Sequence, residues 1–250
     1  MSIYIALHKE CELPELENYV PIQVGAALHD KLSYLTDDAK EDNISEKNPN
    51  FCELTALYYI WKNTSDDVIG LVHYRRFFYK KVFSSNEKNI VDYNTLSYCV
   101  NDNTVVLPQK HYFRTNNYEQ YNKLHSIKDL NLCKKIIQQK YPDYIDSFYA
   151  VMKRNYVYPY NMFVMTRKNF NNYMKWMFNI LFELENQCNI SDYDAYNQRI
   201  FGFMSERLLN IWVLKNKLKI KSFHVYNNSE SLGKHFAEEL ENKIKKYTFF

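Results

Sequence analysis

Short apolar runs alternate with amphipathic segments along the chain. Four runs have the length and composition of buried strands, at residues 3–7, 68–72, 104–107 and 162–165. Four other segments repeat apolar residues every three or four positions and predict helices over residues 51–61, 129–140, 170–184 and 200–214. Strands that alternate with helices predict a layered α/β domain, and continuous apolar strands favour a parallel sheet buried on both faces.

Single residues suggest where these elements begin and end. Asn48 can cap a helix and Pro49 suits its first position, so one helix is expected from there to about residue 63. The polar residues 33–50 before it are predicted to form a long loop. The helix over 200–214 is expected to begin near Ser205. We find no linker, so we predict one domain over residues 1–250 whose residues 216–250 form a helical C-terminal extension.

Composition excludes several classes of protein. The chain has 32 Lys plus Arg against 29 Asp plus Glu, and this net charge of +3 argues against a nucleic-acid binder. Only four glycines occur, and they cannot form a GxGxxG or Walker phosphate loop. Five cysteines without a CxxC pair argue against a zinc ribbon or a disulfide framework and favour a reducing compartment. Without a signal-peptide or membrane-spanning run, the chain is predicted to be cytoplasmic.

Polar residues adjoin three of the predicted strands, at the sheet edge where open α/β sheets bind ligands. His8 and Lys9 follow the first strand, and the sequence His-Tyr-Arg-Arg at 73–76 follows the second. Asn161 precedes the strand at 162–165, which leads to Thr166 and Arg167. We expect these side chains to converge on one site.

The two adjacent arginines of this group suit a phosphate ligand. Arg75 and Arg76 follow a buried strand directly, and a planar guanidinium group pairs well with phosphate oxygens. The neighbouring Tyr74 and His73 can stack on a base or hydrogen-bond to a sugar hydroxyl. The alternative is that both arginines form surface salt bridges with nearby aspartates.

Several other polar residues each have a structural and a functional interpretation. Asp42 and Asn43 suit sugar hydroxyls, but Asx turns explain them equally simply. Glu53 lies in the first turn of its helix, where the helix dipole favours a carboxylate. Glu206 follows Gly202 and can act as a general base, or it can pair with its neighbour at 207.

A metal site has little support in the sequence. No HExxH occurs, and Asp192 and Asp194 have the spacing of a metal-binding carboxylate pair but follow a helix instead of a buried strand. We therefore predict no metal ligands and expect the arginines to neutralise a bound diphosphate. Mn²⁺ or Mg²⁺ is the alternative.

Four segments resemble a known family: residues 42–63 (DNISEKNPNFCELTALYYIWKN), 69–78 (IGLVHYRRFF), 160–165 (YNMFVM) and 199–210 (RIFGFMSERLLN). The family occurs in bacterial capsule, exopolysaccharide and O-antigen gene clusters. It was long labelled a domain of unknown function, and it is similar to GT-A-type glycosyltransferases, with some members associated with galactofuranosyl transfer. The resemblance covers residues 3–214 and implies a GT-A-like, Rossmann-type central sheet flanked by helices.

The resemblance implies transfer of a sugar, galactofuranose or another hexose, from a UDP-sugar to a growing surface polysaccharide or its lipid-linked precursor. The donor-binding residues that it implies are His8, Lys9, Asp42, Asn43, Asn48, His73, Tyr74 and Arg75. It implies catalytic roles for Arg76 and Glu206, and acceptor contacts for His125 and Asn161. A lone histidine such as His125 is more often structural.

The sequence allows two alternatives each for the function and for the C-terminal residues. The 23 tyrosines also suit a non-catalytic saccharide-binding or scaffold module of a polysaccharide assembly complex, because aromatic rings stack on sugars. Residues 235–250 mix large apolar side chains with lysines. They predict either a helix packed on the domain or a helix that lies on the inner face of the plasma membrane, where lipid-linked acceptors are found.

Overall fold

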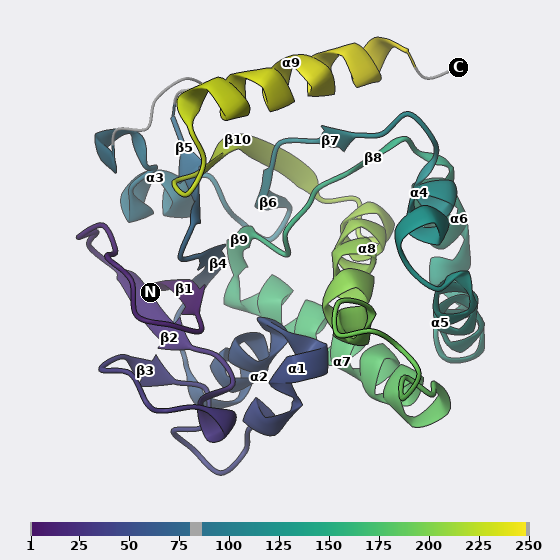
Figure 1. Ribbon diagram of the computed structural model, residues 1–250, viewed down its shortest axis with the longest axis horizontal. Helices are drawn as coiled ribbons and strands as arrows, with labels where there is room; N and C mark the ends of the chain where they lie inside the picture. The colour runs from purple at the N-terminus through teal and green to yellow at the C-terminus, as the bar shows by residue number, and fades with distance from the viewer. Residues whose placement is uncertain (1, 81–86, 249–250) are drawn as a thin grey trace.

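The computed structural model describes residues 2–80 and 87–248 (Figure 1). The strands are β1 (Ser2–Leu7), β2 (Tyr19–Gln23), β3 (Leu35–Thr36), β4 (Val68–His73), β5 (Arg76–Tyr79), β6 (Thr104–Pro108), β7 (His111–Tyr112), β8 (Tyr156–Val157), β9 (Phe163–Thr166) and β10 (Lys219–Asn227). The α-helices are α1 (Asn48–Phe51), α2 (Leu54–Asn63), α3 (Tyr93–Tyr98), α4 (Asn117–Leu124), α5 (Ile127–Lys140), α6 (Ile145–Lys153), α7 (Arg167–Gln187), α8 (Ile200–Lys215) and α9 (Leu232–Tyr247). The four predicted strands and the helices predicted over residues 129–140, 170–184 and 200–214 are present, with bounds shifted by a few residues.

The main sheet is mixed, in the order β3-β2-β1-β4-β5-β10-β6-β9, and β4 also pairs with β9. Strands β3, β2, β1 and β4 are parallel, whereas β5 and β9 run antiparallel to their neighbours. The pairings from β4 through β5, β10, β6 and β9 return to β4, so this part of the sheet closes on itself. The mixed α/β class is confirmed, but an open, mainly parallel sheet was wrong, because a buried apolar run has the same pattern in either strand direction.

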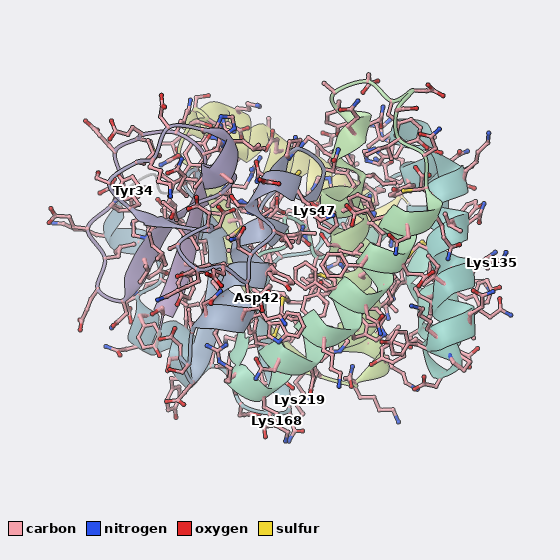
Figure 2. All side chains as sticks on the ribbon, turned by 90° about the horizontal axis from the view of Figure 1, so that it is seen from below. Tyr34, Asp42, Lys47, Lys135, Lys168 and Lys219 are labelled. Atoms are coloured by element: carbon pink, nitrogen blue, oxygen red, sulfur yellow. The ribbon has the colours of Figure 1, made fainter. Side chains whose placement is uncertain are left out.

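Strand β1 shows how the two cores lie on opposite faces of the sheet. Tyr4 and Ala6 belong to the core under α2, α7 and α8, whereas Ile3 and Ile5 belong to the second core, which also contains Leu96 of α3. Figure 2 views the molecule from below Figure 1 and shows α7 crossing this side between α2 and α5. Burial on both faces explains the continuous apolar runs of the central strands.

The helix expected from Asn48 to residue 63 is in fact two helices. The chain breaks at Cys52, whose φ of 52° and ψ of −132° are not helical. The Asn48 side-chain amide donates a hydrogen bond to the Cys52 carbonyl at 2.8 Å. Phe51 and Leu54 are both still fully buried, so the apolar spacing hides the break. The break directs Cys52 and Glu53 into a cavity described below.

Helix α8 begins at Ile200, earlier than the expected start near Ser205. Glu206 therefore lies in the second turn of this helix instead of the first. A Cβ atom at Gly202 would lie 3.1 Å from the Cys52 sulfur, so the glycine permits α8 to pack closely on the α1–α2 break. Glycine has a packing function here that its position in the sequence does not reveal.

Residues 216–250 are not a purely helical extension. Strand β10 lies between β5 and β6 in the main sheet, and α9 follows on the outside of the molecule (Figure 1). The strand was missed because its sequence, KIKSFHVYN, alternates polar and apolar residues and lacks a continuous apolar run. Among the residues that the structure describes, none of the helices is both long enough and apolar enough to cross a membrane.

Candidate functional site

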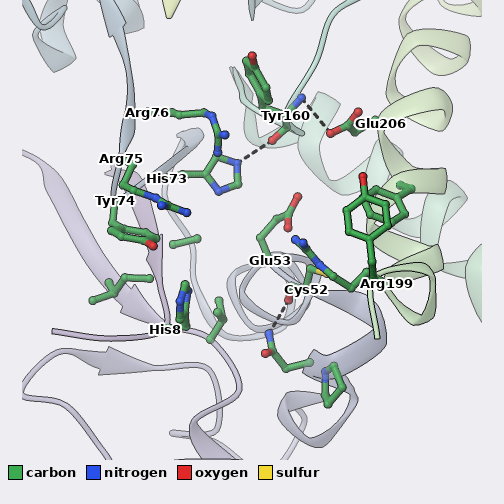
Figure 3. A pocket seen from close by; sticks show the side chains of 17 residues that line it. His8, Cys52, Glu53, His73, Tyr74, Arg75, Arg76, Tyr160, Arg199 and Glu206 are labelled. Atoms are coloured by element: carbon green, nitrogen blue, oxygen red, sulfur yellow. Dashed lines mark hydrogen bonds between the residues drawn. The ribbon is translucent and has the colours of Figure 1, made fainter. Parts of the chain in front are cut away.

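A cavity of about 670 Å³ opens where the C-terminal ends of β1 and β4 meet the chain before β9 (Figure 3). Helices α1 and α8, together with residues 52–53 between α1 and α2, close its other side. Its lining residues are Ala6, Leu7, His8, Val24, Asn48, Pro49, Cys52, Glu53, His73, Tyr74, Arg75, Arg76, Tyr160, Tyr196, Arg199, Phe203 and Glu206. The structure thus brings together His8, His73 to Arg76, and Glu206, which the sequence placed on separate elements.

The turn between β4 and β5 forms one wall of the cavity. His73 pairs with Arg76 across this hairpin. The backbone N–H of Tyr74 donates to a β1 carbonyl at 3.1 Å, and the carbonyl of Arg75 accepts from the backbone N–H of Asn228 at 2.9 Å. Because the turn is held from both sides, its two arginines project from a rigid base.

Both arginine side chains of this turn lie against aromatic rings. The Arg75 guanidinium carbon is 4.8 Å from the centre of the Tyr74 ring, and that of Arg76 is 4.7 Å from the centre of the Tyr160 ring (Figure 3). Stacking restricts these long side chains before any ligand binds. The cost in conformational entropy of ordering them around a ligand is therefore lowered.

Arg199 adds a third guanidinium group from the opposite wall. It belongs to a 3₁₀ turn (Asn197–Arg199), and its Nε donates to the Cys52 sulfur, a weak acceptor, at 3.2 Å. In the described ranges, Arg75, Arg76 and Arg199 have no carboxylate within 4.0 Å. The alternative of surface salt bridges is therefore wrong for both turn arginines, and all three groups are available to an anion.

Two carboxylates, Glu53 and Glu206, face the turn arginines from the wall that also carries Arg199 (Figure 3). Oε1 of Glu53 accepts from the Asn161 amide at 2.7 Å, while its second oxygen has no hydrogen-bond partner in the described part of the chain. Glu206 uses both oxygens: one accepts from the Tyr160 N–H and the other from Arg207, each at 3.2 Å. Burial raises the pKa of Glu206, Arg207 opposes this shift, and the charge of Glu53 adds to it.

The two histidines of the cavity favour their neutral forms. Burial lowers the pKa of His73, and its Nε2 donates to the Tyr160 carbonyl at 2.7 Å, which fixes the tautomer. Partial burial and the nearby charges of Lys9 and Arg75 lower the pKa of His8. The His8 ring contacts the Tyr74 ring edge to face, with the ring centres 5.3 Å apart. In its neutral form, His8 offers a flat surface and one hydrogen-bond acceptor.

Backbone strain is concentrated at this cavity. Cys52, Tyr160 and Asn161 have φ values of 52°, 73° and 52°, a region that residues other than glycine rarely occupy. The first lies between α1 and α2, and the other two form the turn before β9. Such strain persists where the surrounding structure fixes it, and it often marks functional sites.

Asn161 lies behind Glu53 instead of on the cavity wall. The asparagine is 2 % exposed, and its amide nitrogen donates both to Glu53 and, at 3.2 Å, to the Gly202 carbonyl. It therefore orients the carboxylate and ties the turn before β9 to α8. The expectation that Asn161 contacts an acceptor does not match this placement, because its amide group is buried.

Replacing Asn161 by alanine is expected to lower the free energy of unfolding by about 1–3 kcal/mol, because a buried donor and its two acceptors lose their hydrogen bonds. The left-handed backbone at this position adds to the loss. Thermal unfolding measures it, and Asn171→Ala on the exposed side of α7 is the control. Equal melting temperatures for both variants would contradict the role given to Asn161.

Asp42 and Asn43 lie away from the cavity lining. Asp42 accepts from the Tyr58 hydroxyl at 2.8 Å, on the outer side of α2 (Figure 2). Asn43 donates to the Lys40 carbonyl and accepts from the Ser45 N–H, which is the Asx-turn alternative. Their expected contacts with a donor are therefore not supported by this geometry.

Three further residues that were expected to bind a ligand differ in how they lie relative to the cavity. Lys9 is exposed and lies outside the lining, one residue beyond His8. His125 lies behind the cavity wall, where its ring stacks on that of Phe203 with the ring centres 4.1 Å apart. Asn48 does line the cavity, but its amide nitrogen is engaged with the Cys52 carbonyl.

The third strand was expected to present Thr166 and Arg167 to the site, and this is wrong. Strand β9 runs antiparallel to β4, so its beginning lies at the cavity and its end at the opposite edge of the sheet. There Arg167 donates to the Asp66 carbonyl at 2.8 Å. Figure 2 shows the neighbouring Lys168 at the edge of the molecule.

Sequence reasoning missed several cavity residues. Arg199 and Tyr160 lie inside two segments that carry the family resemblance, and this was the available signal. Glu53 was assigned to the helix dipole, and the structure does place it at the N-terminus of α2, but without a side-chain capping bond. Phe203 lies inside the same segment as Arg199, whereas Tyr196 gave no signal in the sequence.

The residues around the cavity do not fit a divalent metal ion. Across residues 2–80 and 87–248, His, Cys, Asp and Glu side chains form no group of three that could hold one. Asp194 accepts from the backbone N–H of Asn197 at 2.8 Å within an exposed turn, and neither it nor Asp192 lines the cavity. The strongly basic side chains in the described lining of the cavity are Arg75, Arg76 and Arg199.

Comparison with known proteins shows what this chain is similar to in sequence and in fold. No curated protein sequence matches the chain. The apo structure of the bifunctional glycosyltransferase WbbM is similar over 92 % of this chain, with 31 % sequence identity and a TM-score of 0.82. This chain spans 45 % of the length of that protein. Residues 2–217 match the model of a domain of unknown function, DUF4422. The chain therefore belongs to the DUF4422 family.

Proposed function

We propose that the chain is a glycosyltransferase that moves a sugar from a UDP-sugar to a saccharide acceptor. The observation that carries the proposal is the set of three guanidinium groups, Arg75, Arg76 and Arg199, that face one cavity without carboxylate partners. Two carboxylates lie in the same cavity. The similarity to WbbM, a bifunctional glycosyltransferase, supports the same conclusion.

The donor diphosphate would lie among the three arginines, and the neutral His8 and the Tyr74 ring would flank the nucleoside. A cavity of about 670 Å³ is of the size that holds a ligand of this kind. Guanidinium groups already stacked on Tyr74 and Tyr160 can bind phosphate oxygens with little reordering. We propose that no divalent ion is required, and activity that depends on Mn²⁺ or Mg²⁺ would contradict this.

The chemistry is a single displacement at the anomeric carbon. The acceptor hydroxyl attacks, its proton passes to a carboxylate, and the bond from the anomeric carbon to the diphosphate oxygen breaks. Negative charge then develops on the leaving diphosphate, where Arg75, Arg76 and Arg199 stabilise it.

We propose Glu53 as the base, because one of its oxygens is free of hydrogen bonds and the other is oriented by Asn161. Glu206, favoured by the sequence, is the second candidate. Its raised pKa suits a base, but both of its oxygens already accept hydrogen bonds.

The family resemblance suggests the transferred sugar and the acceptor. We propose galactofuranose or another hexose as the transferred sugar and a growing bacterial surface polysaccharide or its lipid-linked precursor as the acceptor. We propose that this reaction takes place in the cytoplasm, at the inner face of the plasma membrane. The competing function is a saccharide-binding scaffold, which would bind the acceptor without turning over a donor.

The test is transfer from a panel of UDP-sugars that includes UDP-galactofuranose, UDP-galactopyranose and UDP-glucose. Released UDP and the mass of an oligosaccharide acceptor are measured together. The proposal predicts UDP release matched by an acceptor that gains one hexose, with EDTA present. Binding of the saccharide without turnover of any donor would support the scaffold instead.

A further inference from the structure

Helix α9 packs on the domain through its polar side. His235 is 6 % exposed, and its ring contacts Tyr226 at 5.2 Å. The Asn242 side chain accepts from the backbone N–H of Tyr112 at 2.6 Å and donates to the Lys110 carbonyl at 2.8 Å. A surface helix normally buries its apolar stripe and exposes its polar side. In α9 the arrangement is reversed.

The large apolar side chains of α9 are exposed. Leu232, Phe236, Leu240, Ile244 and Tyr247 are 46 %, 53 %, 51 %, 51 % and 72 % exposed. Their spacing of three or four residues places them on one face along the whole helix. We call this face the apolar stripe. Figure 1 shows α9 on the outside of the molecule, across one end of the sheet.

Unpaired positive charge flanks the apolar stripe. Among the described residues, Lys243 and Lys246 have no carboxylate within 4.0 Å, whereas Lys234 and Lys245 pair with glutamates. Together with Lys110, the two lysines line a cavity of about 350 Å³ between α9, β10 and the β6–β7 segment, and Glu239 also lines this cavity. An exposed apolar stripe beside lysines that form no ion pair is complementary to a surface of acyl chains and anionic phosphates.

We propose that α9 lies on an anionic lipid surface, with the apolar stripe at the boundary between headgroups and acyl chains and with Lys110, Lys243 and Lys246 toward the lipid phosphates. A protein partner is less well matched, because the stripe runs along the whole helix and is flanked by lysines without an ion pair. The family match ends at residue 217, so the proposal does not depend on that match or on the proposed function.

The experiment is co-sedimentation of the full chain with vesicles of phosphatidylcholine alone or mixed with phosphatidylglycerol. The chain is expected to sediment with the mixed vesicles, and less at high salt. Leu240→Ser/Ile244→Ser should weaken this binding at least tenfold. Lys243→Gln/Lys246→Gln should remove the preference for the anionic lipid. Lys135→Gln/Lys175→Gln, the same charge change at exposed positions of α5 and α7, should bind as the native chain does.

Three outcomes would overturn the proposal. The native chain could stay in the supernatant with both kinds of vesicle. The Leu240→Ser/Ile244→Ser variant could sediment as the native chain does. Light scattering without lipid could show that this variant converts a dimer to a monomer, in which case the apolar stripe is an interface between copies of the chain. Circular dichroism of each variant checks that it is folded, so loss of binding is attributed to the surface.

Discussion

Replacing Arg76 by alanine is expected to slow sugar transfer by about 100-fold or more, while the protein stays folded. The guanidinium group faces the cavity, lies on the Tyr160 ring and has no carboxylate partner in the described structure. Removal of one preorganised group that stabilises developing charge typically costs this much in rate. The measurement is kcat with a saturating UDP-sugar, together with the melting temperature.

Arg154 provides a matched control for this substitution. Its guanidinium carbon also lies over a tyrosine, 5.4 Å from the centre of the Tyr156 ring, but outside the cavity lining. Arg154→Ala should therefore leave kcat within about twofold of the native value, since surface changes away from such sites have small effects. Equal losses in both variants, or a near-native rate for Arg76→Ala, would move the diphosphate site elsewhere.

Replacing Glu53 by glutamine is expected to lower kcat by about 10²–10⁴-fold, the contribution of a positioned general base. Glutamine keeps the size of the side chain and can still accept from Asn161, so the fold should be preserved. Glu46→Gln, at an exposed position of the same segment, is the control. The measurement is the rate of UDP release with a saturating donor and acceptor.

The Glu206→Gln variant decides between the two carboxylates. If Glu53 is the base, Glu206→Gln should have the smaller effect on kcat. A larger loss for Glu206→Gln would make Glu206 the base, and burial, which raises its pKa, would then place the acidic limb of the rate profile above the ordinary range of a glutamate.

The sequence predicts most elements of this fold because each leaves a local pattern. The buried runs of β1, β4, β6 and β9 and the apolar faces of α5, α7 and α8 are all visible as periodicity. Strand direction leaves no such mark, so the antiparallel course of β9 and the closure of the sheet were not foreseen. Strand β10 was missed because it is only half buried.

The site could be predicted only where its residues are adjacent in the chain. The His73–Arg76 turn was recognisable, since two arginines after a buried strand are an unusual local combination. Glu53 reaches the cavity because the helix breaks at Cys52, and Arg199 reaches it from the 3₁₀ turn before α8. Neither the break nor the turn has a recognisable pattern in the sequence. Asp42 and Asn43 were expected at the site but lie outside the cavity lining. Short polar side chains form local turns as readily as they bind ligands.

The central claim is that three arginines, without a metal ion, hold a nucleoside diphosphate in the cavity. The most direct measurement is thermal unfolding in EDTA with UDP, uridine or ADP. At 100 times its dissociation constant, a ligand adds about 2.7 kcal/mol of stability, or roughly 5–10 °C for a chain of this size. We predict this shift with UDP, little with uridine, which lacks the diphosphate, and its loss in Arg76→Ala. No shift with any nucleotide, or a shift only when Mn²⁺ is added, would contradict the account.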